Sequence, residues 1–103
     1  MKTYNKLVRD GIPEIIKASG GAPKTRILSD TEYNNALAKK LLEEADEYIK
    51  DPNIKELADI LEVVHAILET QGKSFAELES VRKEKAKERG GFSKRLFLET
   101  VEE

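Results

Sequence analysis

Apolar side chains recur every three or four residues along much of the chain, which is the spacing of an amphipathic helix. The pattern predicts a long helix between a capping box, Ser29-x-x-Glu32, and a break at Asp51-Pro52-Asn53. The apolar stripe of this helix consists of Tyr33, Leu37, Leu41, Ala45 and Tyr48.

A second long helix is predicted from about Ile54 to Gly72, and it carries two apolar stripes. The first stripe consists of Leu57, Leu61, Val64 and Leu68, and the second consists of Ile60, Val63 and Ile67. A helix that is apolar on two sides needs a partner on each side. The preceding helix is one partner, and the other is either the C-terminal helix or a second subunit.

Two further helices follow from local signals. A short one begins near Pro13 and ends at Gly20-Gly21, and a longer one begins at a second capping box, Ser74-x-x-Glu77, and ends at Gly90-Gly91. These elements predict an all-α fold, a helical bundle built on an antiparallel helix hairpin, with residues 1–103 in a single domain.

The two ends of the chain also contain candidate strands. Alternation around Leu96 to Glu99 favours a short strand, and Lys24 to Leu28 reads as an extended segment that could pair with it. The sequence therefore allows a small two-stranded β element beside the helices.

Composition restricts the classes of function. The chain has no cysteine, which excludes disulfides and thiolate metal sites and suits a reducing cytoplasm. Its net charge of -2 lacks the basic excess of a general nucleic-acid binder. No uncharged apolar run is long enough for a signal peptide or a membrane span. We therefore expect a cytoplasmic protein with no nucleic-acid or membrane partner.

Charge is unevenly placed along the chain. Between Leu41 and Glu62 eight acidic residues stand against two lysines, and between Arg82 and Arg95 seven basic residues stand against two glutamates. A cation-attracting and an anion-attracting segment in one small domain suit a ligand that carries both a metal and phosphate. Solvated helix faces are the alternative interpretation of each run.

Four carboxylates are predicted to meet between the two long helices. If the helices fold back on each other at the break, residues at equal distance from it come to equal height. Glu47 then faces Glu56, and Glu44 faces Asp59, at about 7 and 11 Å along the axis for a rise of about 1.5 Å per residue.

Glu56 falls inside the second apolar stripe, where an unpaired carboxylate is costly and a bound divalent cation makes neighbouring carboxylates favourable. All-oxygen ligation suits Mg²⁺ or Mn²⁺, whereas one histidine and no cysteine disfavour zinc. The alternative is an exposed acidic face that pairs with the lysines at positions 39 and 40. The predicted metal ligands are Glu44, Glu47, Glu56 and Asp59.

The two acidic motifs resemble the signature of the all-α NTP pyrophosphatases, the MazG-like superfamily. That signature is E-E-x-x-E followed by E-x-x-D on adjacent helices, and here it reads EEADE at 43–47 and ELAD at 56–59. The flanking segments YNKLVRDGIPEIIKASG and ERGGFSKRLFLE are similar to small members labelled phosphoribosyl-ATP pyrophosphohydrolase-like or house-cleaning nucleotide pyrophosphatases. The resemblance covers most of the chain, and the short gap between the motifs implies a tight hairpin.

The resemblance implies Mg²⁺-dependent hydrolysis of a nucleoside triphosphate, or a related nucleotide, between the α and β phosphates, which releases a monophosphate and pyrophosphate. Carboxylate-bound magnesium can polarise phosphoryl oxygens and lower the pKa of an attacking water. Carried onto this chain, the signature implies catalytic roles for both motifs, with Glu43 as an outer ligand or a base that orients water. The implied catalytic residues are Glu43, Glu44, Glu47, Glu56 and Asp59.

Phosphate also needs positive charge beyond the metal. Lys6 and Arg9 are the first candidates because they belong to the K-L-V-R-D part of the resemblance, and because their spacing would place them on one side of a helical turn. Further candidates from the basic C-terminal region are Arg82, Lys83, Lys94 and Arg95.

The primary prediction is thus a nucleotide pyrophosphohydrolase that acts on a small-molecule nucleotide as a homodimer or higher homo-oligomer. A phosphoribosyl-ATP pyrophosphohydrolase of histidine biosynthesis shares the metal motif and differs in substrate. A non-catalytic helical interaction module, in which the two-faced helix mediates assembly, is the alternative from a different class.

Overall fold

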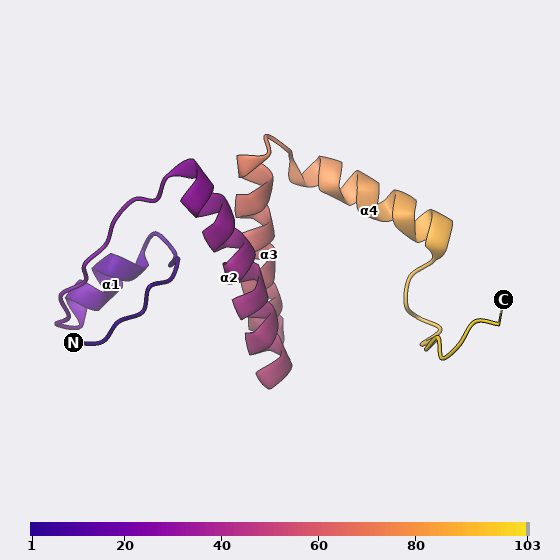
Figure 1. The fold of residues 1–103 in the computed structure, drawn as a ribbon, viewed down its shortest axis with the longest axis horizontal. Coiled ribbons are helices and arrows are strands. Elements are labelled where there is room, and N and C mark those ends of the chain that lie inside the picture. The colour runs from indigo at the N-terminus through magenta and orange to yellow at the C-terminus, as the bar shows by residue number, and fades with distance from the viewer. Residues whose placement is uncertain (103) are drawn as a thin grey trace. The chain divides into compact units, whose positions relative to one another are not determined.

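The computed structural model describes residues 1–102, and every regular element within that range is an α-helix (Figure 1). The helices are α1 (Ile12–Ala18), α2 (Asp30–Lys50), α3 (Ile54–Thr70) and α4 (Phe75–Arg89). The predicted all-α class is therefore confirmed. Within the described residues no helix has the length and apolar character needed to cross a membrane.

The chain comprises two compact units, the first running from Met1 to Gly72 and the second starting at Lys73. The first unit holds α1, α2 and α3, and the second holds α4. The single domain expected for residues 1–103 remains a prediction, and each unit is described by itself.

The first unit is organised by the antiparallel packing of α2 against α3 (Figure 1). The side chains buried in this interface are Leu37 from α2 and Val63 and Leu68 from α3. Leu57 and Leu61, from the other stripe of α3, are about half exposed. Val63 belongs to the second stripe, so that stripe faces α2, whereas Leu68 is a buried member of the first stripe.

Both predicted capping boxes are present. At the start of α2 the Ser29 hydroxyl accepts from the Glu32 backbone N–H (3.3 Å), and the Glu32 carboxylate accepts from the Ser29 N–H (3.2 Å). Ser74 and Glu77 form the same pair of bonds at the start of α4. These side chains satisfy backbone donors that a helix N-terminus leaves free, which is why the sequence located both starts correctly.

Glycines end the two flanking helices. Beyond α1, Gly20 adopts a φ of 93° and Gly21 donates to the Ile16 carbonyl at 2.9 Å. Beyond α4, Gly90 adopts a φ of 83° and donates to the Ala86 carbonyl at 2.8 Å. Such positive φ values are open to glycine at little cost, so both predicted helix ends are confirmed.

The predicted β element is wrong for the described residues, because neither candidate segment forms a strand. Leu96, Phe97 and Leu98 are all largely exposed, so the alternation near the C-terminus has no face to bury. Lys24 to Leu28 likewise carries mostly exposed side chains. Two strands without a covered apolar face are marginal in water, and local alternation alone does not supply that cover.

The hairpin interface predicts a sharp contrast between two leucines of α2. Leu37 is 3% exposed, and Leu37→Ala is expected to lower the free energy of unfolding by about 2 to 4 kcal/mol because it leaves a cavity. Leu42 is 74% exposed, and Leu42→Ala should cost less than about 0.5 kcal/mol. Urea unfolding followed by circular dichroism measures both values. Equal losses would contradict the assigned core.

Candidate functional site

The turn between α2 and α3 decides which carboxylates meet. Asp51 leaves the helical conformation, with φ −147° and ψ 82°, as expected for a residue before proline, which disfavours the α region. Asn53 caps α3 by accepting from the backbone N–H groups of Lys55 (2.9 Å) and Glu56 (3.2 Å), and its amide donates to the Asp51 carbonyl (3.1 Å). These bonds close the turn within three residues, so the first turn of α3 starts beside the end of α2.

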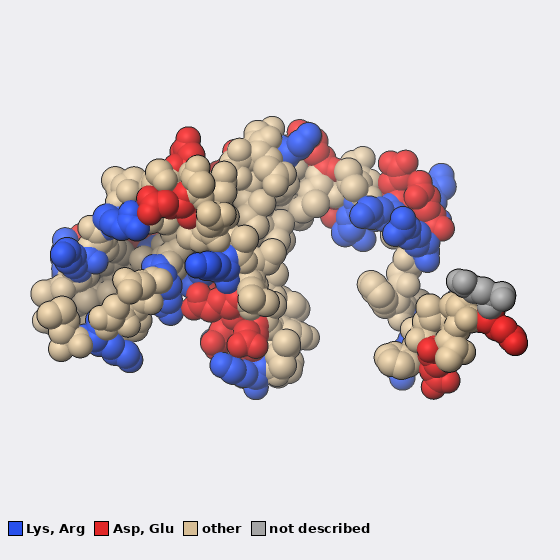
Figure 2. Space-filling model, viewed as in Figure 1, with Lys and Arg blue, Asp and Glu red and all other residues tan. Residues whose placement is uncertain are grey.

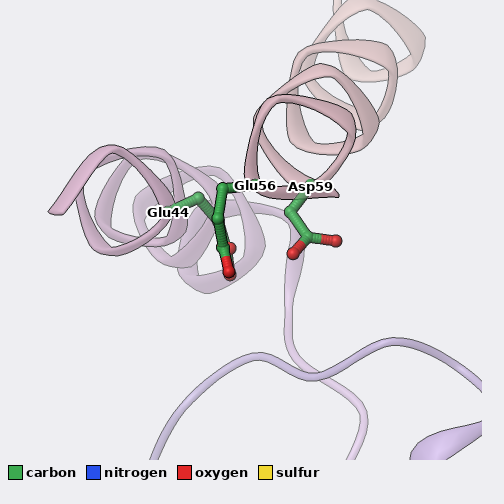
Figure 3. A group of neighbouring side chains, drawn as sticks. All are labelled: Glu44, Glu56 and Asp59. Atoms are coloured by element: carbon green, nitrogen blue, oxygen red, sulfur yellow. The ribbon is translucent and has the colours of Figure 1, made fainter. Parts of the chain in front are cut away.

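Acidic side chains gather over the α2–α3 hairpin, with basic side chains at their border (Figure 2). Three carboxylates converge beside the turn: Glu44 projects from α2, and Glu56 and Asp59 project from α3 (Figure 3). One oxygen of each lies within 4.8 Å of the others, and all three residues are partly buried. We call these three residues the carboxylate triad. It contains one of the pairs matched by height, Glu44 with Asp59.

Two other predicted acidic residues lie outside the triad. Glu47 is exposed, although its charge is close enough to contribute to the raised pKa of Glu56. Glu43 lies at the margin, where its carboxylate accepts a hydrogen bond from Lys6 Nζ at 3.3 Å and pairs with Lys40 at 3.5 Å. The structure therefore brings together three of the four predicted metal ligands. Glu43, which was predicted as an outer ligand or base, is paired with two lysines.

The carboxylates differ in their electrostatic surroundings. Partial burial, followed by repulsion from Asp59, Glu47 and Glu44, raises the pKa of Glu56 above its ordinary value. Partial burial alone would raise the pKa of Glu43 as well, but the hydrogen bond from Lys6 and the charge of Lys40 hold that pKa below its ordinary value. Partial burial and the neighbouring carboxylates thus disfavour the charged form of Glu56. A bound divalent cation would relieve this repulsion.

Lys6 and Arg9 reach the carboxylates, but not from a helix. Both lie in the segment before α1, which has no regular structure, so their predicted placement on a helical turn is wrong. The helix starts later because Gly11 occupies its N-cap and Pro13 its first turn. The Arg9 guanidinium donates to Asp59 Oδ1 at 2.7 Å, which joins the segment directly to the triad.

Lys40 lies in the site, and the sequence named it only in the alternative interpretation, as a partner of an exposed acidic face. Its ammonium lies 3.5 Å from Glu43 and 3.4 Å from Glu44, and its side chain is only 16% exposed. The signal was the spacing of three and four residues to these glutamates, which also describes an ordinary surface pair. Its partial burial is a property of the folded chain that this spacing does not predict.

The remaining predicted phosphate-binding residues belong to the second unit. Within α4, the Arg82 Nε donates to Glu79 at 3.0 Å, which pairs it within its own helix. Arg95 has a φ of 57° and follows Lys94 in the segment after α4. Of the six predicted cations, the structure brings Lys6 and Arg9 to the carboxylates, while Arg82, Lys83, Lys94 and Arg95 are described only within the second unit.

The donor set of the triad fits a hard divalent cation. In octahedral Mg²⁺ coordination, with bonds of about 2.1 Å, neighbouring oxygens lie about 3.0 Å apart and only opposite ones about 4.2 Å apart. The triad oxygens lie within 4.8 Å of one another, so a bound ion would need to draw them closer by up to about 1.8 Å. The triad is also open to solvent.

A separate hollow lies at the opposite end of the hairpin, far from the triad. The residues that line this hollow are Asp30, Tyr33, Asn34, Glu69 and Thr70.

Comparison with known proteins gives a partial match. An uncharacterized protein of Mycolicibacterium smegmatis is 60% identical to the chain over 42 residues, which is 41% of this chain and 43% of that protein. The match therefore spans less than half the length of this relative. No protein-family model and no solved structure matches the chain. A function has to be sought in the chemistry of the chain itself.

The raised pKa of Glu56 predicts that Glu56→Gln stabilises the metal-free protein. Because folding disfavours the charged form, the ionised carboxylate costs stability at neutral pH, and this cost is absent below the unfolded pKa of about 4.3. The substitution should raise the midpoint of thermal unfolding by a few degrees at pH 7 and by little at pH 3.5.

Differential scanning calorimetry in EDTA measures this shift. Glu62→Gln provides a matched control, because Glu62 is an exposed glutamate on the same helix. If Glu56→Gln lowered the midpoint at pH 7, or changed it no more than the control does, the inferred repulsion within the triad would be rejected.

Proposed function

We propose that this chain is a Mg²⁺-dependent nucleotide pyrophosphohydrolase of the all-α NTP pyrophosphatase, or MazG-like, superfamily. The observation that carries the proposal is the meeting of Glu44, Glu56 and Asp59 at the α2–α3 turn. These residues come from both acidic motifs of the resemblance. The proposed reaction is house-cleaning hydrolysis, in the cytoplasm, of a nucleoside triphosphate between the α and β phosphates to a monophosphate and pyrophosphate.

Each acidic residue has a distinct part in this proposal. The triad supplies oxygen ligands from two helices, and Glu47 is a candidate fourth ligand because its charge already acts on Glu56. Glu43, whose pKa is held low by Lys6 and Lys40, would orient water at the margin of the triad. Bound magnesium would supply charge neutralisation at the phosphoryl oxygens and a more acidic water.

The cations beside the triad support a phosphate-bearing ligand. Arg9 and Lys6 lie within hydrogen-bond distance of Asp59 and Glu43, so both are next to the place where a metal would hold phosphate oxygens. A guanidinium can bind two phosphate oxygens at once, which suits Arg9 to this role. The cations of the second unit, Arg82, Lys83, Lys94 and Arg95, remain candidates for the rest of the nucleotide.

We further propose that the protein works as a homodimer or higher homo-oligomer. Exposed apolar residues of α3, Ile54, Leu57 and Leu61, fall within about 60° of one another around the helix. Leu42 and Ile49 share a similar exposed face of α2, and both faces point away from the triad on a helical wheel. A second copy of the chain is the proposed occupant, because the hairpin alone buries few side chains and association would leave the site open.

Metal binding is the direct test of the triad. Titration calorimetry with Mn²⁺ is expected to show saturable binding to the wild-type protein and at least about a tenfold loss of affinity in Asp59→Asn, because an amide oxygen is a far weaker ligand than a carboxylate. Glu62→Gln removes one charge from the exposed side of α3 and should bind as the wild type does. Equal binding by Asp59→Asn would reject the assigned ligands.

Turnover is tested by a pyrophosphate-release screen over standard, deoxy and damaged nucleoside triphosphates and phosphoribosyl-ATP. The proposal expects Mg²⁺-dependent release from at least one triphosphate, abolished in Asp59→Asn. Release from phosphoribosyl-ATP alone would instead identify the histidine-biosynthesis enzyme. No release from any of them, with metal binding absent as well, would favour the non-catalytic helical module.

Assembly is tested by light scattering after size exclusion. The wild type is expected to elute as a dimer or larger species, and Leu57→Glu with Leu61→Glu should shift it towards the monomer because charges would be buried in the interface. Ile27→Glu is the control, since Ile27 is fully exposed outside the hairpin. A wild-type monomer across the accessible concentration range would exclude this interface.

A further inference from the structure

The segment before α1 is joined to the hairpin by two charged contacts, and two of its apolar side chains are partly buried. We call residues 1–11 the N-terminal strap. Leu7 and Val8 are partly buried, whereas Lys6 and Arg9 reach carboxylates that lie 37 and 50 residues later in the sequence. The partial burial of Leu7 and Val8 therefore restrains the strap independently of its ion pairs.

Basic side chains of the protein pair with carboxylates that would bind a divalent cation. Arg9 is bonded to Asp59 at 2.7 Å, and Lys40 lies 3.4 Å from Glu44. Asp59 and Glu44 both belong to the carboxylate triad. Two of the three triad carboxylates thus have a positive partner within the chain.

Lys40 and Arg9 differ in how readily each can separate from its carboxylate. Lys40 is only 16% exposed and lies one turn before Glu44 on the same helix, so its place follows from α2 itself. Arg9 is 56% exposed and Asp59 is 39% exposed, so breaking their bond leaves neither charge buried without solvent. Arg9 is therefore the cation that can be exchanged at low cost.

We propose that Arg9 is an exchangeable cation of this site, resting on the function proposed above. Its guanidinium holds Asp59 in the metal-free protein, gives up that carboxylate to the incoming divalent cation, and then binds a phosphate of the ligand that the cation carries. The repulsion between guanidinium and metal drives the exchange, and the strap keeps Arg9 within reach of the phosphate. Binding of metal and binding of phosphate are thereby coupled through one side chain.

The first test measures Mn²⁺ affinity by titration calorimetry at constant ionic strength, without nucleotide. Arg9→Gln removes the competing cation and is expected to bind Mn²⁺ about three- to fivefold more tightly than the wild type. Arg9→Lys keeps the charge and should remain near the wild type. Arg26→Gln is the matched control, because Arg26 is an exposed arginine paired with Glu32 at the start of α2.

The outcomes separate this proposal from the proposed function. If the wild type binds Mn²⁺ and Arg9→Gln binds it equally or more weakly, Arg9 only positions Asp59 and the exchange is overturned, while the metal site stands. If no variant binds Mn²⁺, both the metal site and the exchange that depends on it are overturned.

The second test follows the guanidinium to its new partner. With saturating Mn²⁺, inorganic pyrophosphate is expected to bind Arg9→Gln about tenfold more weakly than the wild type, because a charge-assisted contact is lost. Arg26→Gln should be unaffected. The exchange predicts that loss of Arg9 raises the affinity for Mn²⁺ and lowers the affinity for pyrophosphate. Unchanged pyrophosphate affinity would overturn the proposal that Arg9 binds phosphate after it leaves Asp59.

Discussion

The packing of α2 against α3 across a three-residue turn is the contact on which the rest of the first unit depends. Its buried side chains, Leu37, Val63 and Leu68, fix how the two helices are rotated against each other. That rotation, and the short turn capped by Asn53, bring the acidic residues of α2 and α3 to the same height and the same side. Apolar packing thus determines the geometry of a polar site.

This arrangement has an electrostatic cost. Glu56 is partly buried among other carboxylates, and its raised pKa reports that conflict. Its position in the first turn of α3 gives some relief, because the N-terminus of a helix favours negative charge. Further relief comes from Lys40 beside Glu44 and from Arg9 beside Asp59. Carboxylates that repel one another gain more from a bound cation than isolated carboxylates do, which is the usual relation between stability and function at such sites.

The success of prediction varied with the range of the interactions involved. The helix starts at Ser29 and Ser74 were predictable because each capping box is complete within four residues. The β element failed because strand pairing needs distant partners and a covered face, neither of which alternation near Leu96 can report. The helical turn expected around Arg9 failed because Gly11 and Pro13 set the start of α1 after it. The partial burial of Lys40 could not be predicted from its spacing to Glu43 and Glu44, because burial depends on how the whole chain packs.

The sequence by itself determined the limits of the helices and the spacing of both acidic motifs from the turn, since caps, breaks and helical rise are local properties. Only the tertiary structure decided which stripe of α3 faces α2, and with it that Glu56 joins Glu44 and Asp59 while Glu47 stays outside. Only the tertiary structure, too, brought Arg9 to Asp59 from fifty residues away. Those outcomes depend on the rotation of one helix against another and on the path of the N-terminal strap, which arise from packing between distant segments.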